Sequence, residues 1–180
     1  MQTEEPAILM VRARHINLSK GKVAIVDDED FERVGGYKWH ANKQRNVWYA
    51  MRHSLWANDK RDLIYMHREI MGLQKGNGLQ IDHVNHNGLD NRRCNLRICT
   101  NQQNQFNTLK SKNKSSIFKG VRYYAKRGKW CAQIKHNGVF FHLGYFTTEE
   151  GAALAYSVAA IARFGEFALL NEIKESRHQA

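Results

Sequence analysis

The chain has 180 residues, which is enough for one ordinary domain or two small ones. Its apolar content of 42% allows buried cores to form and excludes a wholly disordered protein. The formal net charge of +11 favours a polyanionic partner, because each Lys or Arg docked on a phosphate releases condensed counterions.

The basic residues are unevenly distributed along the chain. Twelve Lys or Arg residues and no Asp or Glu lie between Asp90 and Glu149. A surface kept charged only for solubility normally mixes both signs. This stretch therefore favours nucleic acid as the partner.

The cysteines and the absence of long apolar runs bear on the compartment. Three cysteines form no CxxC pair and no even disulfide framework, which is typical of reduced thiols in a cytosolic protein. No signal peptide opens the sequence, and no apolar run approaches the roughly 18 residues of a membrane span. We therefore expect a cytoplasmic protein without a membrane partner.

Residues 8–66 are predicted to form short strands and turns. The runs at 11–17 and 22–26, on either side of a Lys20-Gly21 turn, predict a hairpin, and a short helix is expected over 29–34. For the aromatic residues that follow, core and hairpin packing is favoured over base stacking; they are Trp39, Trp48, Tyr49, Trp56 and Tyr65.

Residues 67–108 contain the pattern that carries chemistry. A short apolar run ends in Asp82-His83, a turn-rich loop follows, and a second short strand covers 96–99. A helix that carries Asn104 comes next. We expect this strand–loop–strand–helix segment to bring Asp82, His83 and Asn104 together.

Hydrolysis of a phosphodiester needs a hard cation and a general base, and this segment offers both. Asp82 and Asn104 supply oxygen ligands that suit Mg²⁺ or Mn²⁺, and the His83 imidazole can accept a proton near neutral pH. The Asn95 side chain is placed to brace the loop by hydrogen-bonding to backbone groups. The alternative is a long turn with His83 on the surface. It is disfavoured because Asn95 and Asn104 stand at spacings that are compatible with Asp82-His83.

This segment resembles the HNH (ββα-metal) nuclease family, in particular its phage and intron-encoded homing type. Asp82-His83 matches the family's Asp-His, in which Asp is a metal ligand and His the general base. Asn95 matches the asparagine of the family name, and Asn91 matches another structural asparagine. His67-Arg68 resembles an upstream His-Arg, and Asn104 stands at the second metal-binding position.

The resemblance implies an endonuclease that cuts double-stranded DNA with one divalent ion, Mg²⁺ or Mn²⁺, in a bacterium or a phage-infected host cell. It makes His83 and Asn95 the catalytic residues and Asp82 and Asn104 the metal ligands. Many members carry His where this chain has Asn104, which implies weaker metal binding. The zinc-binding cysteine pairs of some relatives are missing, so no structural zinc is expected.

Two further histidines keep alternative interpretations. His67 is open between packing of a helix and contact with DNA. His86 is open between a phosphate contact, a substitute ligand and a solvated loop position, of which the last is favoured.

The C-terminal part has a clearer pattern. Residues 109–117 hold three lysines and three serines and predict a flexible basic linker. Three strands are predicted at 118–124, 129–136 and 139–146, the last two joined by an Asn-Gly hairpin turn.

An alanine-rich helix is predicted to follow these strands. A capping box of Thr147 and Glu150 opens it, it runs from about Thr148 to Phe164, and Gly165 ends it. Its alanines would let the helix lie very close to the sheet.

The strand periodicity predicts two different faces. In the second strand, Trp130, Ala132 and Ile134 share one side, and Lys129, Gln133 and Lys135 share the other. In the first strand, we expect Val121 and Tyr123 to point inward and Arg122 and Tyr124 to point outward. The outward set is cationic with interleaved aromatics, as expected of a sheet laid into a major groove.

This region resembles the apetala/ethylene-response-factor DNA-binding domain of plant transcription factors. The match is carried by the runs at 119–122, 128–135 and 142–150 and by the helix. The resemblance implies that seven residues face DNA: Lys119, Arg122, Tyr124, Lys129, Gln133, Lys135 and His142. The family usually has Arg or Trp where Lys119, Phe140 and His142 stand, so the sequence preference is expected to differ.

Together these patterns predict an α+β protein. Residues 1–108 would form a small N-terminal sheet with the HNH hairpin, 109–117 the linker, and 118–174 a three-stranded antiparallel sheet packed on one helix. The predicted function is a metal-dependent DNA endonuclease. A non-catalytic DNA-binding regulator and an RNA-binding accessory protein are the alternatives, and a dimer on DNA is left open.

Overall fold

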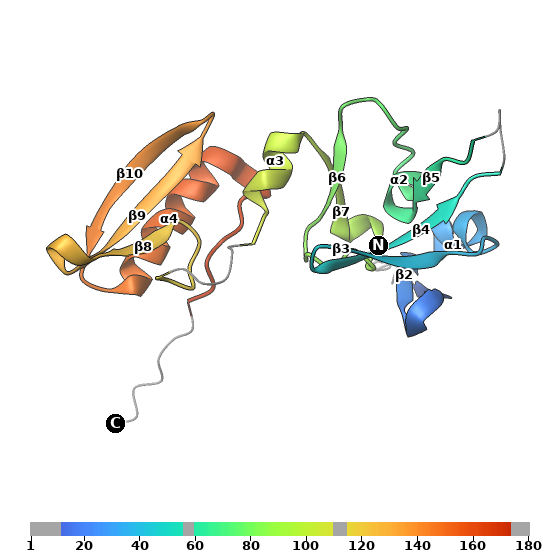
Figure 1. Ribbon diagram of the computed structural model, residues 1–180, viewed down its shortest axis with the longest axis horizontal. Helices are drawn as coiled ribbons and strands as arrows, with labels where there is room; N and C mark the ends of the chain where they lie inside the picture. Colours follow the sequence, from blue (N-terminus) through green and yellow to red (C-terminus); the bar gives the residue numbers. More distant parts are fainter. Residues whose placement is uncertain (1–11, 56–59, 110–114, 174–180) are drawn as a thin grey trace, which may run out of the picture. The chain divides into compact units, whose positions relative to one another are not determined.

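The computed structural model describes residues 12–55, 60–109 and 115–173, and it confirms the predicted mixed α+β architecture (Figure 1). The chain forms two compact units, Met1–Asn101 and Gln102–Ala180, which we describe one after the other. Trp56 and most of the predicted linker lie outside the described residues. Within the described ranges, no helix has the length and apolarity needed to span a membrane.

The first unit begins with the predicted hairpin. β1 (Ala13–Asn17) pairs antiparallel with β2 (Val23–Asp27) across a turn, η1 (Ser19–Gly21), in which Lys20 and Gly21 have φ values of 60° and 62°. The helix α1 (Asp28–Val34) follows directly, and Gly35 is its C-cap residue.

A three-stranded antiparallel sheet follows in the order β3 (His40–Gln44), β4 (Val47–His53) and β5 (Leu63–Tyr65). The short helix α2 (Met66–Ile70) comes next. These elements share one apolar core, whose large buried side chains include Val26, Val34, Trp39, Met66 and Ile70. Trp39 thus packs in the core as predicted.

The segment with the candidate chemistry forms a second two-stranded sheet in this unit. β6 (Gln80–His83) and β7 (Leu96–Cys99) pair antiparallel, and a short turn, η2 (Arg93–Asn95), precedes β7. The loop between them is attached to β2, because Ile25 N donates to Leu89 O at 2.8 Å and Asn91 N donates to Ile25 O at 2.7 Å.

The second unit begins with α3 (Asn101–Phe106), apart from its first residue. Three strands follow, β8 (Val121–Tyr124), β9 (Lys129–His136) and β10 (Val139–Phe146), with η3 (Ala125–Arg127) between the first two. They form an antiparallel sheet in the order β10-β9-β8. The helix α4 (Glu149–Phe164) and the turn η4 (Gly165–Phe167) complete the unit.

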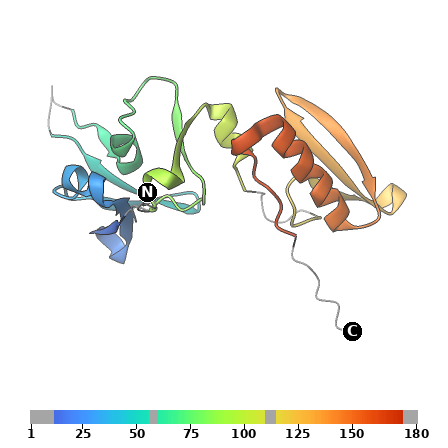
Figure 2. The ribbon, with the colours of Figure 1, turned by 180° about the vertical axis from the view of Figure 1, so that it is seen from behind.

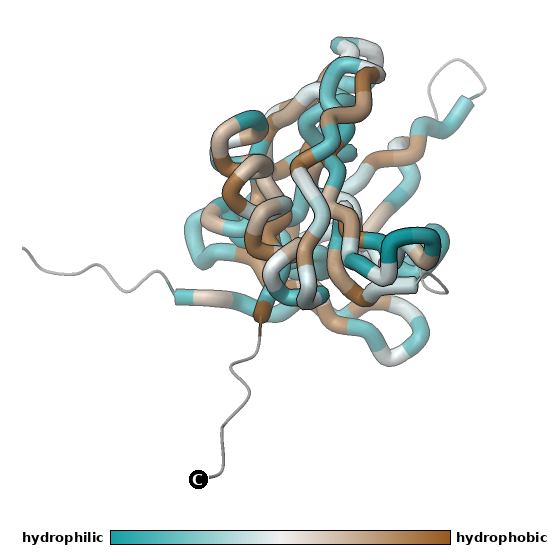
Figure 3. The backbone as a smooth tube through the Cα atoms, turned by 90° about the vertical axis from the view of Figure 1, so that its left-hand side faces the viewer, coloured by the Kyte–Doolittle hydropathy of each residue, from teal (hydrophilic) through white to brown (hydrophobic). Residues whose placement is uncertain are grey.

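One face of this sheet is covered by α4, which confirms the predicted sheet packed on one helix (Figure 2). Ala152, Ala153 and Ala160 are fully buried, so the helix lies close to the strands as predicted. The approach is closest at Gly120, where an added Cβ would lie 1.9 Å from the Tyr156 ring. Hydrophobic positions recur at intervals along the elements, whereas many turns are hydrophilic (Figure 3).

The predicted capping box is wrong by one position. The N-cap residue of α4 is Thr148, whose Oγ1 accepts a hydrogen bond from Gly151 N at 3.1 Å. Glu149 accepts from Ile117 N at 3.2 Å, which attaches the start of the helix to the segment before β8. A capping rule considers only neighbouring residues, so it cannot predict this contact with a distant segment.

Two details of the predicted faces also differ. Tyr123 lies on the side of Trp130, with ring centroids 5.1 Å apart, yet it stays 45% exposed. Cys131 lies on the outward side but is buried, with its Sγ 3.5 Å from Nδ1 of His142.

Candidate active site

The β6–β7 hairpin places the predicted metal ligand and the predicted base together at a strand end. β6 ends in Asp82 and His83, which stand opposite Arg97 and Leu96 of β7. Asp82 is 6% exposed and His83 is 5% exposed. His83 is therefore not the surface residue of the disfavoured alternative.

Asn95 connects the two ends of the loop between these strands. Its Oδ1 accepts from Asn85 N at 2.9 Å, and its Nδ2 donates to Asp90 O at 2.7 Å. Asn95 is buried, so loss of these bonds would leave polar groups without partners in the interior. The bracing contacts predicted for Asn95 are present, and its catalytic assignment stays a prediction.

Asp90 forms a second polar anchor in the loop, which sequence reasoning missed. Its carboxylate accepts from Nε and Nη2 of Arg92 at 2.8 and 2.7 Å and from Nδ2 of Asn85 at 2.9 Å. The hydrogen bond from Arg92 holds the pKa of Asp90 below its ordinary value. Asn91 is fully buried, and its Nδ2 donates to Leu89 O at 3.1 Å.

Two rings lie beside the candidate base, and a third lies beside one of them. The ring centroid of His83 lies 5.0 Å from that of His67 and 5.8 Å from that of Tyr49. The ring centroid of Tyr65 lies 5.4 Å from that of His67. For Tyr49 and Tyr65 the sequence favours packing over base stacking. No local sequence signal places Tyr49 beside His67 and His83, or Tyr65 beside His67.

Burial keeps both histidines neutral. It lowers the pKa of His67 to about 3, with smaller contributions from His83 and Arg68. Burial also lowers the pKa of His83, although Asn91, Asp82 and the more distant Asp90 act in the opposite direction. A neutral imidazole can accept a proton, so the state of His83 suits a general base.

Asp82 is bound by an arginine that sequence reasoning did not single out. Nε and Nη2 of Arg97 both donate to Oδ2 of Asp82, at 2.9 and 2.6 Å. The Asp82 side chain is 7% exposed and the Arg97 side chain is 14% exposed. The two residues are direct cross-strand partners, a signal that appears only when the register is known.

Gly88 brings the loop between β6 and β7 against β4. A Cβ at this position would lie 2.5 Å from Trp48 O and 2.7 Å from the Tyr49 ring. The loop can therefore approach β4, the strand that carries Tyr49, this closely only because residue 88 has no side chain.

Two further candidates from the sequence are His86 and Asn104. His86 is partly buried and has left-handed backbone with φ 61°, and its role stays open. Asn104 lies on α3, and from Gln102 onward this helix belongs to the second unit. Its role as a metal ligand stays a prediction.

One carboxylate cluster is close enough to share an ion, but it has an arginine beside it. Asp27, Glu29 and Asp30 have ligand atoms within 4.8 Å of one another. Arg93 Nε lies 2.9 Å from Glu29 and 2.8 Å from Asp30, and Arg93 N donates to Asp27 at 2.7 Å. We interpret this cluster as a structural ion-pair network.

The sheet of the second unit has a cationic face opposite α4. The register pairs Arg122 with Cys131 and Gln133 with His142, so these side chains share that face. Lys129 and Lys135 are exposed on it, and Tyr124 is partly buried. The structure thus brings six of the seven predicted DNA-facing residues onto one surface.

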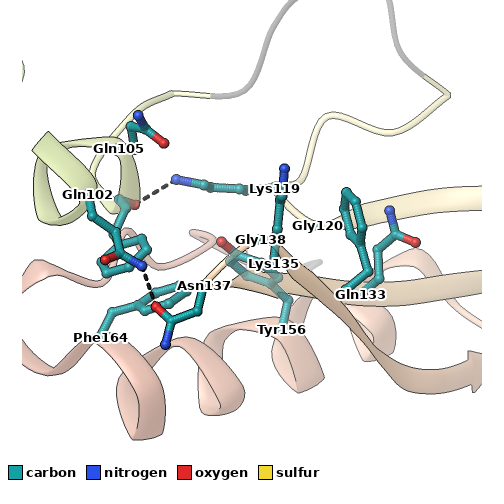
Figure 4. Close-up of a pocket in the computed structure, with 12 residues that line it drawn as sticks. Gln102, Gln105, Lys119, Gly120, Gln133, Lys135, Asn137, Gly138, Tyr156 and Phe164 are labelled. Carbon is teal, nitrogen blue, oxygen red and sulfur yellow. Dashed lines mark hydrogen bonds between the residues drawn. The ribbon is translucent and has the colours of Figure 1, made fainter.

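Lys119 differs from the other six. Its Nζ donates to the carbonyl oxygens of Phe106 and Thr108 at 2.6 and 2.7 Å, at the C-terminal end of α3. Burial lowers the pKa of Lys119 to about 8. Lys119 borders a pocket of about 630 Å³, and Figure 4 shows its side chain reaching toward the α3 segment. Lys119 therefore has a structural partner inside its own unit.

Comparisons with known proteins agree with the hairpin geometry. Residues 65–106 match the family model described as HNH endonuclease. A protein of Acanthamoeba polyphaga mimivirus, named as an uncharacterized HNH endonuclease, is 34% identical over 154 residues. That match covers 86% of this chain and 77% of the viral protein.

Proposed function

The chain belongs to the HNH endonuclease family, and on that premise we propose that it is a metal-dependent nuclease of the homing type that cuts double-stranded DNA. The observation that carries this proposal is the pairing of a buried, charged Asp82 with a buried, neutral His83 at one strand end. The first can hold a cation and the second can accept a proton. Phosphodiester hydrolysis requires both groups within one site.

Nucleases of this family generally use a divalent metal ion. The donors fit a hard cation, because the Asp82 carboxylate and the Asn104 amide both offer oxygen ligands. We assign Asp82 and Asn104 as the residues that would hold Mg²⁺ or Mn²⁺. Such an ion polarises the phosphoryl oxygen and stabilises charge on the leaving oxygen.

His83 would accept the proton of the attacking water. Its neutral state follows from burial, and the nearby Asp82 and Asn91 favour the imidazolium that forms when the proton arrives. Asn95 would hold the loop that carries these groups in place through its two backbone hydrogen bonds. The site thus combines a proton acceptor with fixed surroundings.

We assign the second unit as a DNA-gripping module similar to the apetala/ethylene-response-factor domain. Its exposed cationic face supports this assignment, because Arg and Lys there can contact phosphates and base edges. The contacting residues would be Arg122, Tyr124, Lys129, Gln133, Lys135 and His142. Lys119 is left out because its ammonium group binds backbone carbonyls.

Nicking of supercoiled plasmid in Mg²⁺ tests the nuclease proposal. The wild-type protein should convert the plasmid to open-circular or linear DNA, and His83→Ala should lose this activity. His15→Ala is the matched control, because His15 is exposed on β1 of the same unit. If neither wild type nor His15→Ala nicks the plasmid but both retain it in a gel shift, the protein is a non-catalytic DNA-binding regulator.

A further inference from the structure

The Asp82 carboxylate already has a positive partner in the metal-free protein. Nε and Nη2 of Arg97 donate to the same oxygen, Oδ2, and the pair is largely shielded from water. Arg97 is charged at every physiological pH. The pair therefore has no net charge.

In the described part of the chain, the two aspartates that act on His83 each have an arginine partner. Asp82 and Asp90 are the carboxylates that act on His83, and Asp90 is bound by Arg92 at 2.7 Å. Asn104, the second ligand assigned above, carries no charge. A divalent ion that enters beside Asp82 therefore brings two positive charges into a site whose carboxylates are neutralised.

DNA supplies the missing negative charge. A phosphodiester carries one negative charge, and its two non-bridging oxygens can accept two parallel hydrogen bonds from a guanidinium such as that of Arg97. A phosphate next to the pair can therefore compensate the ion and accept hydrogen bonds from Arg97. Neither compensation exists without DNA.

We propose that Arg97 makes metal binding at Asp82 depend on a bound DNA phosphate. Without DNA, the guanidinium occupies Asp82 Oδ2 and repels the ion, and metal binds weakly. With DNA, the phosphate interacts with both the Arg97 guanidinium and the metal ion, and the metal binds tightly. Arg97 is thus a positioning residue that couples metal loading to the substrate, and this inference rests on Asp82 being the metal ligand proposed above.

Mn²⁺ titration of the full chain tests the coupling, with free Mn²⁺ measured by electron paramagnetic resonance. The experiments use the His83→Ala background so that duplex DNA of mixed sequence stays intact. In this parent, added duplex should tighten Mn²⁺ binding at the Asp82 site by about tenfold or more. Arg97→Gln should tighten binding without DNA by a similar factor and reduce the further gain from duplex.

Three variants serve as controls. Arg97→Lys keeps the charge and should retain weak binding without DNA. Arg14→Gln removes an arginine of the same unit from an exposed ion pair with Asp28, 2.9 Å long, and should behave as the parent. Asp82→Asn measures Mn²⁺ held by the duplex and by other carboxylates, and this background is subtracted.

The outcomes separate this inference from the proposed function. If Asp82→Asn binds Mn²⁺ as the parent does, Asp82 is not the ligand and the metal assignment fails. If Asp82→Asn loses the ion but Arg97→Gln binds it no more tightly than the parent without DNA, the inference about Arg97 is overturned alone. Should Arg97→Gln not fold, a parent affinity that duplex leaves unchanged overturns the inference equally.

Discussion

Arg97 and Asp82 face each other across β7 and β6, and two nitrogens of the arginine donate to a single oxygen of the aspartate. The charge of the Asp82 carboxylate in the candidate active site is therefore balanced by a cation of the protein itself. Because the pair is shielded from water, it affects folding as well as chemistry.

Breaking this ion pair should destabilise the metal-free protein. Arg97→Ala leaves Asp82 charged and buried, so we expect a loss of about 3–5 kcal/mol in the free energy of unfolding. Arg14→Ala removes an exposed ion pair and should cost about 0–1 kcal/mol. Urea denaturation of both variants without metal measures the difference. Equal small losses would contradict the buried pair.

The buried His67 should make stability depend on acid pH. Its folded pKa of about 3 lies below the ordinary value of 6.5, so the folded state resists protonation. The contribution is complete above about pH 6.5 and is lost as the pH falls toward 3, by up to about 1.4 kcal/mol per pH unit. Urea unfolding at several pH values should show a weaker acid dependence for His67→Gln. Parallel pH curves for the two proteins would exclude a buried, neutral His67.

Lys119 and Lys135 should differ in their effects on DNA binding. Lys135→Ala should reduce the slope of log K against log salt by about 1, because one phosphate contact is lost. Lys119→Ala should leave the slope unchanged and lower the thermal stability instead, because two carbonyl groups lose their donor. Titration of duplex DNA at several salt concentrations, with thermal unfolding alongside, checks both effects. A reduced slope for Lys119→Ala would place that residue on DNA.

The wild-type slope itself is a further test. If about six cationic side chains neutralise phosphates, log K should fall against log salt with a slope near −5. The same titrations provide this value. A slope near zero would rule out a phosphate-binding surface on the protein.

Gly88 should not tolerate a side chain. The Cβ of Gly88→Ala would overlap a backbone oxygen and a ring of β4, so we expect a loss of about 1–3 kcal/mol and reduced nicking. Gly36→Ala is the control, because nothing lies within 4 Å of the added Cβ. Denaturation and plasmid assays on both variants test the fit. Wild-type behaviour of Gly88→Ala would show that the loop moves freely away from β4.

Local patterns were sufficient for most of the secondary structure. Asp82-His83 ends a strand, a second strand runs over 96–99, and Asn137-Gly138 forms the tight turn, with φ values of 51° and 81°. Each of these features depends on residues close together in the chain, where alternation and turn chemistry act directly.

The missed features depend on contacts between distant segments. Arg97 reaches Asp82 through the strand register, and Tyr49 and His67 reach His83 through tertiary packing. The family pattern implies a DNA contact for Lys119, whereas the structure places its ammonium group on two carbonyl oxygens at the end of α3. A single sequence does not reveal these contacts, because the residues that meet are far apart along the chain.

The β6–β7 hairpin owes its stability to segments outside it. The two strands pair over only four residues each, and a short isolated hairpin is marginal in water. Backbone bonds from Ile25 and the fit of Gly88 against β4 supply further support. A transplant of residues 65–106 alone would leave these supports behind and should not fold. Gene rearrangements that exchange one of the two units should therefore preserve the whole region 13–101 as one inherited block.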